Sequence, residues 1–187
     1  WFLTDHMAPN RKVVRLDFNN INLGFEEIIS ETPLSIRSVD IINQNFVINY
    51  LNDTFSNIKY FSKEGKEIGS LELDSLGSIS GFAGKKEDDS TFYSFTNFKQ
   101  PNQIYKFNLL TGRSELFWEE NLSNFDPNNY ETRLEFFPSK DGTLIPLHIT
   151  HKKDLQIDSN TPVLLYGYGG FNISILPRFS KRYLAWM

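Results

Sequence analysis

A glycine-rich turn near the end of the 187-residue chain carries the residues best suited to chemistry. Tyr168 lies between Gly167 and Gly169, Gly170 follows directly, and the apolar run Pro162 to Tyr166 precedes the turn. Glycine adopts positive φ without steric cost, so this backbone could approach a bound molecule closely and aim the tyrosine hydroxyl at it. We therefore predict that Tyr168 is a functional residue and that Gly167, Gly169 and Gly170 shape its backbone.

The remaining polar groups do not form a second centre of this kind. The chain has no cysteine, which excludes disulfides, thiol nucleophiles and thiolate metal sites within it. His148 and His151 lie three positions apart on a predicted strand, so they point to opposite faces and cannot share a metal ion. His6 stands alone in a predicted hairpin, Asp141 serves a predicted turn, and the run Lys85 to Asp89 is a solvated charged turn. We expect neither a metal nor a cofactor.

Composition and charge limit the kinds of binding partner that the chain is expected to have. The chain is 40% apolar and 15% aromatic, which is enough for a hydrophobic core. Its net charge is −4 and its basic and acidic residues are interspersed, so no basic field favours nucleic acid or an anionic membrane. No apolar run approaches the roughly 20 residues that span a bilayer, and no export signal precedes the first strand. We therefore expect no nucleic-acid or membrane partner and a cytoplasmic location.

Short strand-like runs recur through the first two thirds of the chain with a period near 45 residues. One set begins at Phe2, Val47 and Phe92, each 45 residues after the last. A second set begins at Val13, Ile58 and Ile104, spaced by 45 and 46 residues. Polar turns separate the two runs of each pair, as in antiparallel hairpins.

Further strands complete each repeat. A preceding strand is predicted at Ser35 to Val39 and at Ile79 to Phe82, and an outer strand at Ile68 to Leu73 and at Glu115 to Trp118. About four antiparallel strands in a period near 45 are typical of a β-propeller blade. We therefore predict about three blades over residues 1–123, although a β-sandwich with coincidental spacing is the alternative. Since a closed propeller needs roughly four to eight blades, we expect further blades before Trp1.

The pattern changes at the polar, proline-containing segment Asn124 to Tyr130, which is typical of a connector between domains. Alternating runs at Glu131 to Phe137 and Thr143 to His151 predict a hairpin around Asp141. The continuous apolar run Pro162 to Tyr166 favours a central strand that is covered on both faces. The predicted fold class is mainly β, with the start of an α/β domain over residues 124–187.

Several segments are similar to one known family: Phe136 to Thr143, Ile145-Pro146, His151-Lys152-Lys153 and Leu164 to Ile175, and more loosely Gly77 to Ile79 and Thr91 to Thr96. They resemble the prolyl oligopeptidase (prolyl endopeptidase) family. In that family a seven-bladed propeller caps an α/β-hydrolase domain, so the resemblance implies C-terminal blades of a propeller followed by the first strands of the hydrolase domain. It also implies a serine peptidase that cuts short peptides on the carboxyl side of proline, with the propeller restricting access.

The resemblance assigns roles to two side chains. Tyr168 matches the tyrosine whose hydroxyl donates to the oxyanion, and Phe171 matches a phenylalanine of the proline pocket. No Gly-x-Ser-x-Gly motif occurs in the chain, and in the hydrolase fold the serine, acid and histidine of the triad all follow this first glycine turn. The resemblance therefore implies a partial chain that is inactive alone, and a complete protein that is a monomer binding short proline-containing peptides.

Two alternatives remain open from the sequence. A propeller can serve as a non-catalytic interaction module, because fold alone does not settle function. A sister group of oligopeptidases with the same architecture cuts after basic residues, and the pocket residues that would separate it from the proline-directed group are not in this chain.

Overall fold

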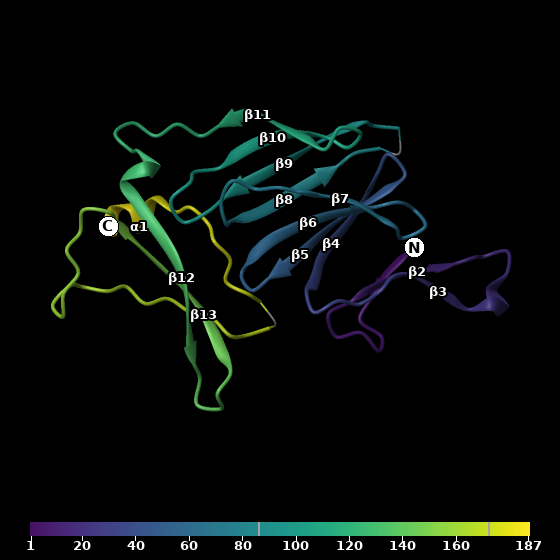
Figure 1. The fold of residues 1–187 in the computed structure, drawn as a ribbon, viewed down its shortest axis with the longest axis horizontal. Helices are drawn as coiled ribbons and strands as arrows, with labels where there is room; N and C mark the ends of the chain where they lie inside the picture. Colours follow the sequence, from purple (N-terminus) through teal and green to yellow (C-terminus); the bar gives the residue numbers. More distant parts are fainter. Residues whose placement is uncertain (86, 172) are drawn as a thin grey trace.

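The computed structural model describes residues 1–85, 87–171 and 173–187. Lys86 of the charged turn and Asn172 of the glycine motif lie outside the described residues. Three antiparallel sheets follow one another along the chain (Figure 1). The first contains β1 (Phe2–Thr4), β2 (Lys12–Leu16) and β3 (Phe25–Ile29). The second contains β4 (Ser35–Ile42), β5 (Asn45–Asn52), β6 (Phe55–Phe61) and β7 (Glu67–Leu71). The third contains β8 (Ser78–Ala83), β9 (Ser90–Thr96), β10 (Gln103–Asn108) and β11 (Arg113–Glu119).

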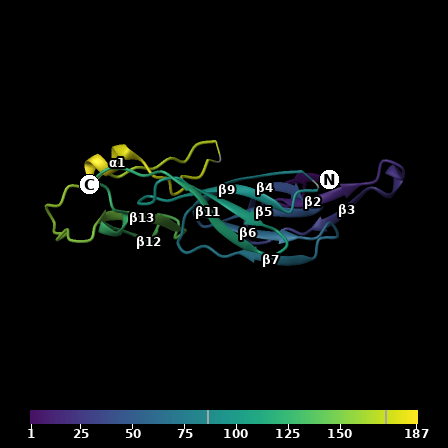
Figure 2. The ribbon, with the colours of Figure 1, turned by 90° about the horizontal axis from the view of Figure 1, so that it is seen from above.

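Each sheet is a meander in which sequence neighbours pair, as the 45-residue period predicted. The second and third sheets have four strands each, whereas the first has three strands among the described residues. The sheets form an open arc rather than a closed ring (Figure 1). Viewed from above, they extend away from a separate hairpin near the C-terminal end (Figure 2).

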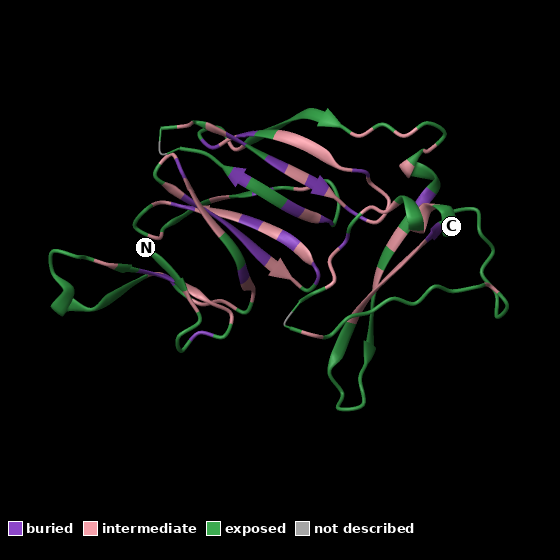
Figure 3. Cartoon of the chain, turned by 180° about the vertical axis from the view of Figure 1, so that it is seen from behind, coloured by how far each residue is buried: buried purple, intermediate pink, exposed green. Residues whose placement is uncertain are grey.

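Two hydrophobic layers hold the arc together, and both use the alternation of side chains along a strand. Phe46, Ile48 and Tyr50 of β5 point toward the first sheet and join a buried cluster with its Val13. Val47, on the opposite face of β5, joins a second cluster with residues of the third sheet. The middle sheet is therefore buried on both faces, and its central strands are the most buried part of the chain (Figure 3). The second cluster also contains Ile42, Ile58, Leu71, Ile79, Phe82, Tyr93, Phe95, Phe107 and Leu109.

The outward face of the third sheet is exposed. Phe92 occupies the repeat position of Val47, yet 44% of its surface is exposed whereas only 1% of Val47 is. Its ring packs edge-on against Phe117 of β11, with centroids 5.1 Å apart. Trp118 of the same outer strand is 47% exposed. No sheet of the described residues covers this face. In a propeller, apolar faces of this kind are normally buried between neighbouring blades.

The hairpin expected after the connector is present as β12 (Tyr130–Pro138) and β13 (Leu144–Lys152). At its turn the Asp141 carboxylate accepts a hydrogen bond from the Thr143 backbone N–H at 3.0 Å, which keeps the pKa of this exposed carboxyl low. Asp141 therefore has the conformational role that the sequence predicted. Short 3₁₀ turns lie at η1 (Ile21–Leu23) and η2 (Pro127–Asn129).

The predicted central strand at Pro162 to Tyr166 is wrong for this chain. The segment has no sheet pairing, and Val163 and Leu165 are 80% and 78% exposed. A central strand needs hydrogen-bonding neighbours along its edges, but β12 and β13 pair only with each other in the described residues. The chain then continues without regular structure to the short helix α1 (Lys181–Trp186). No helix of the described residues has the length and apolar character needed to cross a bilayer.

Candidate functional site

The glycine turn brings Tyr168 and Phe171 into one short segment. The Tyr168 ring folds over Gly170, where a Cβ atom would lie only 3.0 Å from the phenolic oxygen. The Ile173 backbone N–H donates to the Gly170 carbonyl oxygen at 3.1 Å and closes the turn behind them. A side chain at position 170 would therefore require the tyrosine ring to shift by a few tenths of an ångström.

The backbone of this turn differs from the prediction. None of Gly167, Gly169 and Gly170 adopts positive φ, whereas Phe171 does, with φ of 54°. The glycines were expected to take the left-handed conformation because they tolerate it best. In the structure the left-handed conformation instead falls at Phe171, directly after Gly170. Gly167 and Gly169 border open space, so their proposed shaping role has no steric cause among the described residues.

Both aromatic side chains of the turn are accessible. Tyr168 is 48% exposed and Phe171 is 92% exposed. Among residues 1–85, 87–171 and 173–187, no group hydrogen-bonds to the Tyr168 hydroxyl. This hydroxyl is consequently available to donate to a ligand, and the Phe171 ring offers a bare apolar face.

The two histidines of β13 have separate partners, in agreement with their predicted opposite faces. His148 Nε2 lies 2.5 Å from Thr54 Oγ1 in the β5–β6 turn, and its ring is 5.0 Å from that of Phe98 in the β9–β10 turn. His151 donates from Nδ1 to the Lys152 carbonyl at 2.8 Å, while its Nε2 lies 3.0 Å from Glu131 Oε1 without hydrogen-bond alignment. Within the described part of the chain, no three acidic or histidine side chains gather as metal ligands.

His148 should make the free energy of unfolding depend on pH. Burial lowers its pKa from the ordinary value of 6.5, so the unfolded chain binds more protons than the folded chain below that pH. Its contribution to stability is complete above 6.5 and is lost as pH falls through the folded-state pKa. We expect the urea midpoint to fall more between about pH 7.5 and about pH 5 in the unmodified chain than in His148→Gln, which keeps a hydrogen-bonding group but does not titrate. Equal pH profiles for the two chains would refute this assignment.

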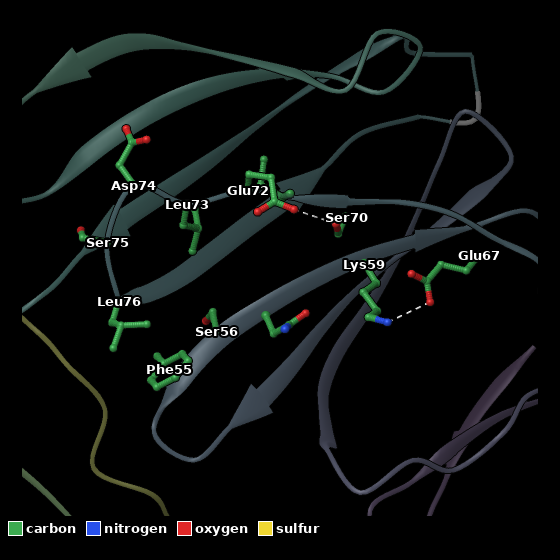
Figure 4. A pocket seen from close by; sticks show the side chains of 12 residues that line it. Phe55, Ser56, Lys59, Glu67, Ser70, Glu72, Leu73, Asp74, Ser75 and Leu76 are labelled. Carbon is green, nitrogen blue, oxygen red and sulfur yellow. Dashed lines mark hydrogen bonds and ion pairs between the residues drawn. The ribbon is translucent and has the colours of Figure 1, made fainter. Parts of the chain in front are cut away.

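An open depression lies against β6, β7 and the segment of residues 72–76 (Figure 4). Lys59 Nζ pairs with Glu67 at 2.9 Å, and the Ser70 hydroxyl donates to Glu72 at 3.1 Å. Lys59, Glu67 and Glu72 are thus already paired with neighbouring side chains within the depression. It contains none of the residues that the sequence singled out, and its side chains do not form a nucleophile–base pair.

Sequence reasoning missed the turn between β9 and β10. Thr96, Phe98 and Lys99 of this turn contact residues of the C-terminal third of the chain. Thr96 belongs to a segment that carries the looser resemblance, but no local signal predicts these contacts, because a threonine at a strand end and an aromatic in a turn are common. Their partners lie far away in the sequence and are known only once the chain is folded.

Three meanders that pack face to face through buried aliphatic and aromatic side chains define the class of the molecule, which is a β-propeller protein. The model of the prolyl oligopeptidase N-terminal beta-propeller domain matches residues 1–120. The chain belongs to the prolyl oligopeptidase family. This agrees with the resemblance that the sequence motifs indicated.

Similar proteins support the same family. The prolyl endopeptidase of Elizabethkingia meningoseptica is 37% identical over 190 residues, which cover 100% of this chain and 26% of that protein. The prolyl endopeptidase of Dictyostelium discoideum is 31% identical over 194 residues, which cover 97% of this chain and 25% of that protein. The chain spans about a quarter of the length of these relatives.

Solved structures share the fold. A prolyl endopeptidase structure, described for the role of inter-domain dynamics in catalysis and specificity, matches 98% of this chain and 27% of its own chain with a TM-score of 0.93 and 36% identity. Prolyl oligopeptidase B from Galerina marginata, bound to a 25mer macrocyclization substrate, matches 95% of this chain and 25% of its own chain with a TM-score of 0.87 and 28% identity. The arrangement of the described sheets is therefore that of known family members.

Proposed function

We propose that the complete protein is a serine endopeptidase that cuts short peptides on the carboxyl side of proline by acyl transfer. The observation that carries the proposal is the similarity over the whole chain to proteins named prolyl endopeptidase, together with the accessible tyrosine in the glycine turn. The same similarity favours a proline-directed enzyme over one that cuts after basic residues, and over a non-catalytic propeller.

Tyr168 is proposed as a donor to the oxyanion. A neutral phenol donates a hydrogen bond to negative charge that develops in the transition state, without adding a formal charge of its own. The Tyr168 hydroxyl, which has no hydrogen-bond partner among the described residues, suits that task, because a donor already bonded within the protein would have to exchange partners. Phe171 is proposed as part of the proline pocket, where its exposed face would pack on the pyrrolidine ring. Gly170 would leave room for the tyrosine ring beside it.

Residues 1–123 are assigned in this proposal to about three propeller blades, and residues 124–187 to the connector and the start of an α/β-hydrolase domain. The change from packed meanders to a hairpin and an exposed coil supports a boundary in the connector. The propeller would limit access of long chains to the site. The proposal includes a cytoplasmic location, with which a chain without cysteine is compatible, and a monomeric state, which the family resemblance implies.

The isolated chain should not hydrolyse a chromogenic peptide that carries proline before the cleaved bond. Serine attack needs a nucleophile with an adjacent base, and no Gly-x-Ser-x-Gly motif is present in these 187 residues. The complete protein should hydrolyse the proline substrate and be inactivated by a serine-directed fluorophosphonate. A matched substrate with arginine before the cleaved bond serves as the control. A complete protein that is inactive on the proline substrate, or that prefers the arginine substrate, would refute the proposed function.

A further inference from the structure

The β9–β10 turn of the third sheet touches three separate parts of the C-terminal region. The Thr96 hydroxyl oxygen accepts a hydrogen bond from the Phe179 backbone N–H at 3.2 Å. The Phe98 ring lies beside His148 of β13, and Lys99 Nζ donates to the Tyr130 carbonyl at the start of β12, 3.4 Å away. Three residues, Thr96 at the end of β9 and Phe98 and Lys99 in the turn, thus contact both strands of the hairpin and the coil that follows the glycine turn.

The turn itself is held firmly. The buried Asn97 accepts from the backbone N–H groups of Lys99 and Gln100 at 3.0 and 2.8 Å, and its amide nitrogen donates to the Leu76 carbonyl at 3.2 Å. The Thr96 hydroxyl donates to the Gln100 carbonyl at 2.9 Å while it accepts from Phe179. A rigid turn of this kind is a fixed point to which a more loosely held segment can be attached.

The segment attached to it follows the glycine turn directly. Pro177 is fully buried and the Phe179 ring packs on Phe125 of the connector, with centroids 5.4 Å apart. Lys181 forms an ion pair with Glu120 at 2.9 Å, just beyond β11. At its other end the same coil leaves the hairpin where the Lys153 N–H donates to the Asn129 carbonyl at 2.9 Å. The glycine turn therefore sits in a long loop, one end of which is bonded to Asn129 of the connector and the other end of which is fastened beside the third sheet.

We infer that the β9–β10 turn is the docking element for this loop and that Thr96 is a positioning residue for Tyr168 and Phe171. Fastening the end of a loop removes conformations that its middle would otherwise sample. Losing the fastening leaves the hydroxyl of Tyr168 and the ring of Phe171 chemically intact but less often in place. The docking depends only on the contacts given above, whereas its effect on turnover rests on the proposed peptidase function.

Thr96→Val tests the docking in the chain itself. Valine keeps the shape of threonine but cannot accept from the Phe179 N–H, whereas Thr96→Ser keeps the acceptor and is the matched control. Measured by NMR, solvent exchange of the Phe179 amide should be about 2- to 10-fold faster in Thr96→Val, the range expected for one neutral hydrogen bond. Thr96→Ser should exchange like the unmodified chain. Unchanged exchange at Phe179 in Thr96→Val would overturn the docking.

Two further measurements separate a loss of docking from a general loss of folding, and docking itself from its effect on turnover. If the β9 amides of Thr96→Val lose the protection from solvent exchange that the folded sheet gives them, Glu120→Gln is used as the test variant instead. Glutamine has the shape of glutamate but weakens the ion pair with Lys181 on the same segment, and it leaves β9 unchanged. Unchanged exchange of the Phe179 amide in Glu120→Gln would then overturn the docking. In the complete protein, Thr96→Val should lower kcat about 2- to 10-fold and Thr96→Ser should restore it. Faster exchange with unchanged kcat in an active enzyme would overturn the positioning role. A complete protein without any peptidase activity would refute the proposed function and leave the exchange result standing.

Discussion

Replacing Tyr168 by phenylalanine in the complete protein should lower kcat by about 10²- to 10³-fold, the usual cost of losing one oxyanion donor. The change removes only the phenolic oxygen, which no described residue hydrogen-bonds in the structure. Stability should therefore be unchanged. KM for a proline-containing peptide should change little, because the lost hydrogen bond would form mainly in the transition state.

Tyr166→Phe is the matched control for this prediction. Tyr166 lies two residues earlier in the same exposed segment and is 61% exposed, but it has no proposed contact with the substrate. Its variant should keep the unmodified kcat. Steady-state kinetics of both variants decide the matter: a kcat for Tyr168→Phe that equals that of Tyr166→Phe would remove Tyr168 from the oxyanion role.

The propeller part of the fold was predictable because its signal is repeated and local. Val47 and Phe92 occupy the same place in successive periods, and the strands begin close to where the spacing predicted. A blade buries both faces of its central strands, so the period carries information about packing as well as about strand positions. The exposed Phe92 agrees with this pattern, because the equivalent residue of the previous repeat, Val47, is covered by the neighbouring sheet.

The site was less predictable, because its geometry depends on distant partners. The run Pro162 to Tyr166 has the apolar character of a central strand, but a strand exists only where neighbours accept its hydrogen bonds. Glycine permits positive φ without requiring it, and in this turn Phe171 takes that conformation. Thr96 lies in a segment that carries the looser resemblance, but nothing in the sequence indicated its contact, since its partner Phe179 is 83 positions away.

Phe107→Ala should destabilise the folded chain by about 3 to 5 kcal/mol, which is typical of emptying a buried phenylalanine site. Phe107 is 0% exposed at the interface between the second and third sheets. Its ring contacts Tyr60 and Phe82 at centroid distances of 5.8 and 6.4 Å, so both sheets lose packing when it is removed. Since the free energy of unfolding of a domain is usually only about 5 to 15 kcal/mol, this one change should remove a large part of it.

Urea unfolding followed by tryptophan fluorescence measures this loss, because Trp118 lies on the neighbouring strand β11. Leu110→Ala is the control: Leu110 is 67% exposed in the next turn, so its variant should stay within about 0.5 kcal/mol of the unmodified chain. Phe107→Leu, which fills part of the space, should fall between the two. If the alanine variants at positions 107 and 110 unfolded at the same urea concentration, the inter-sheet cluster would not be what holds the third sheet to the second.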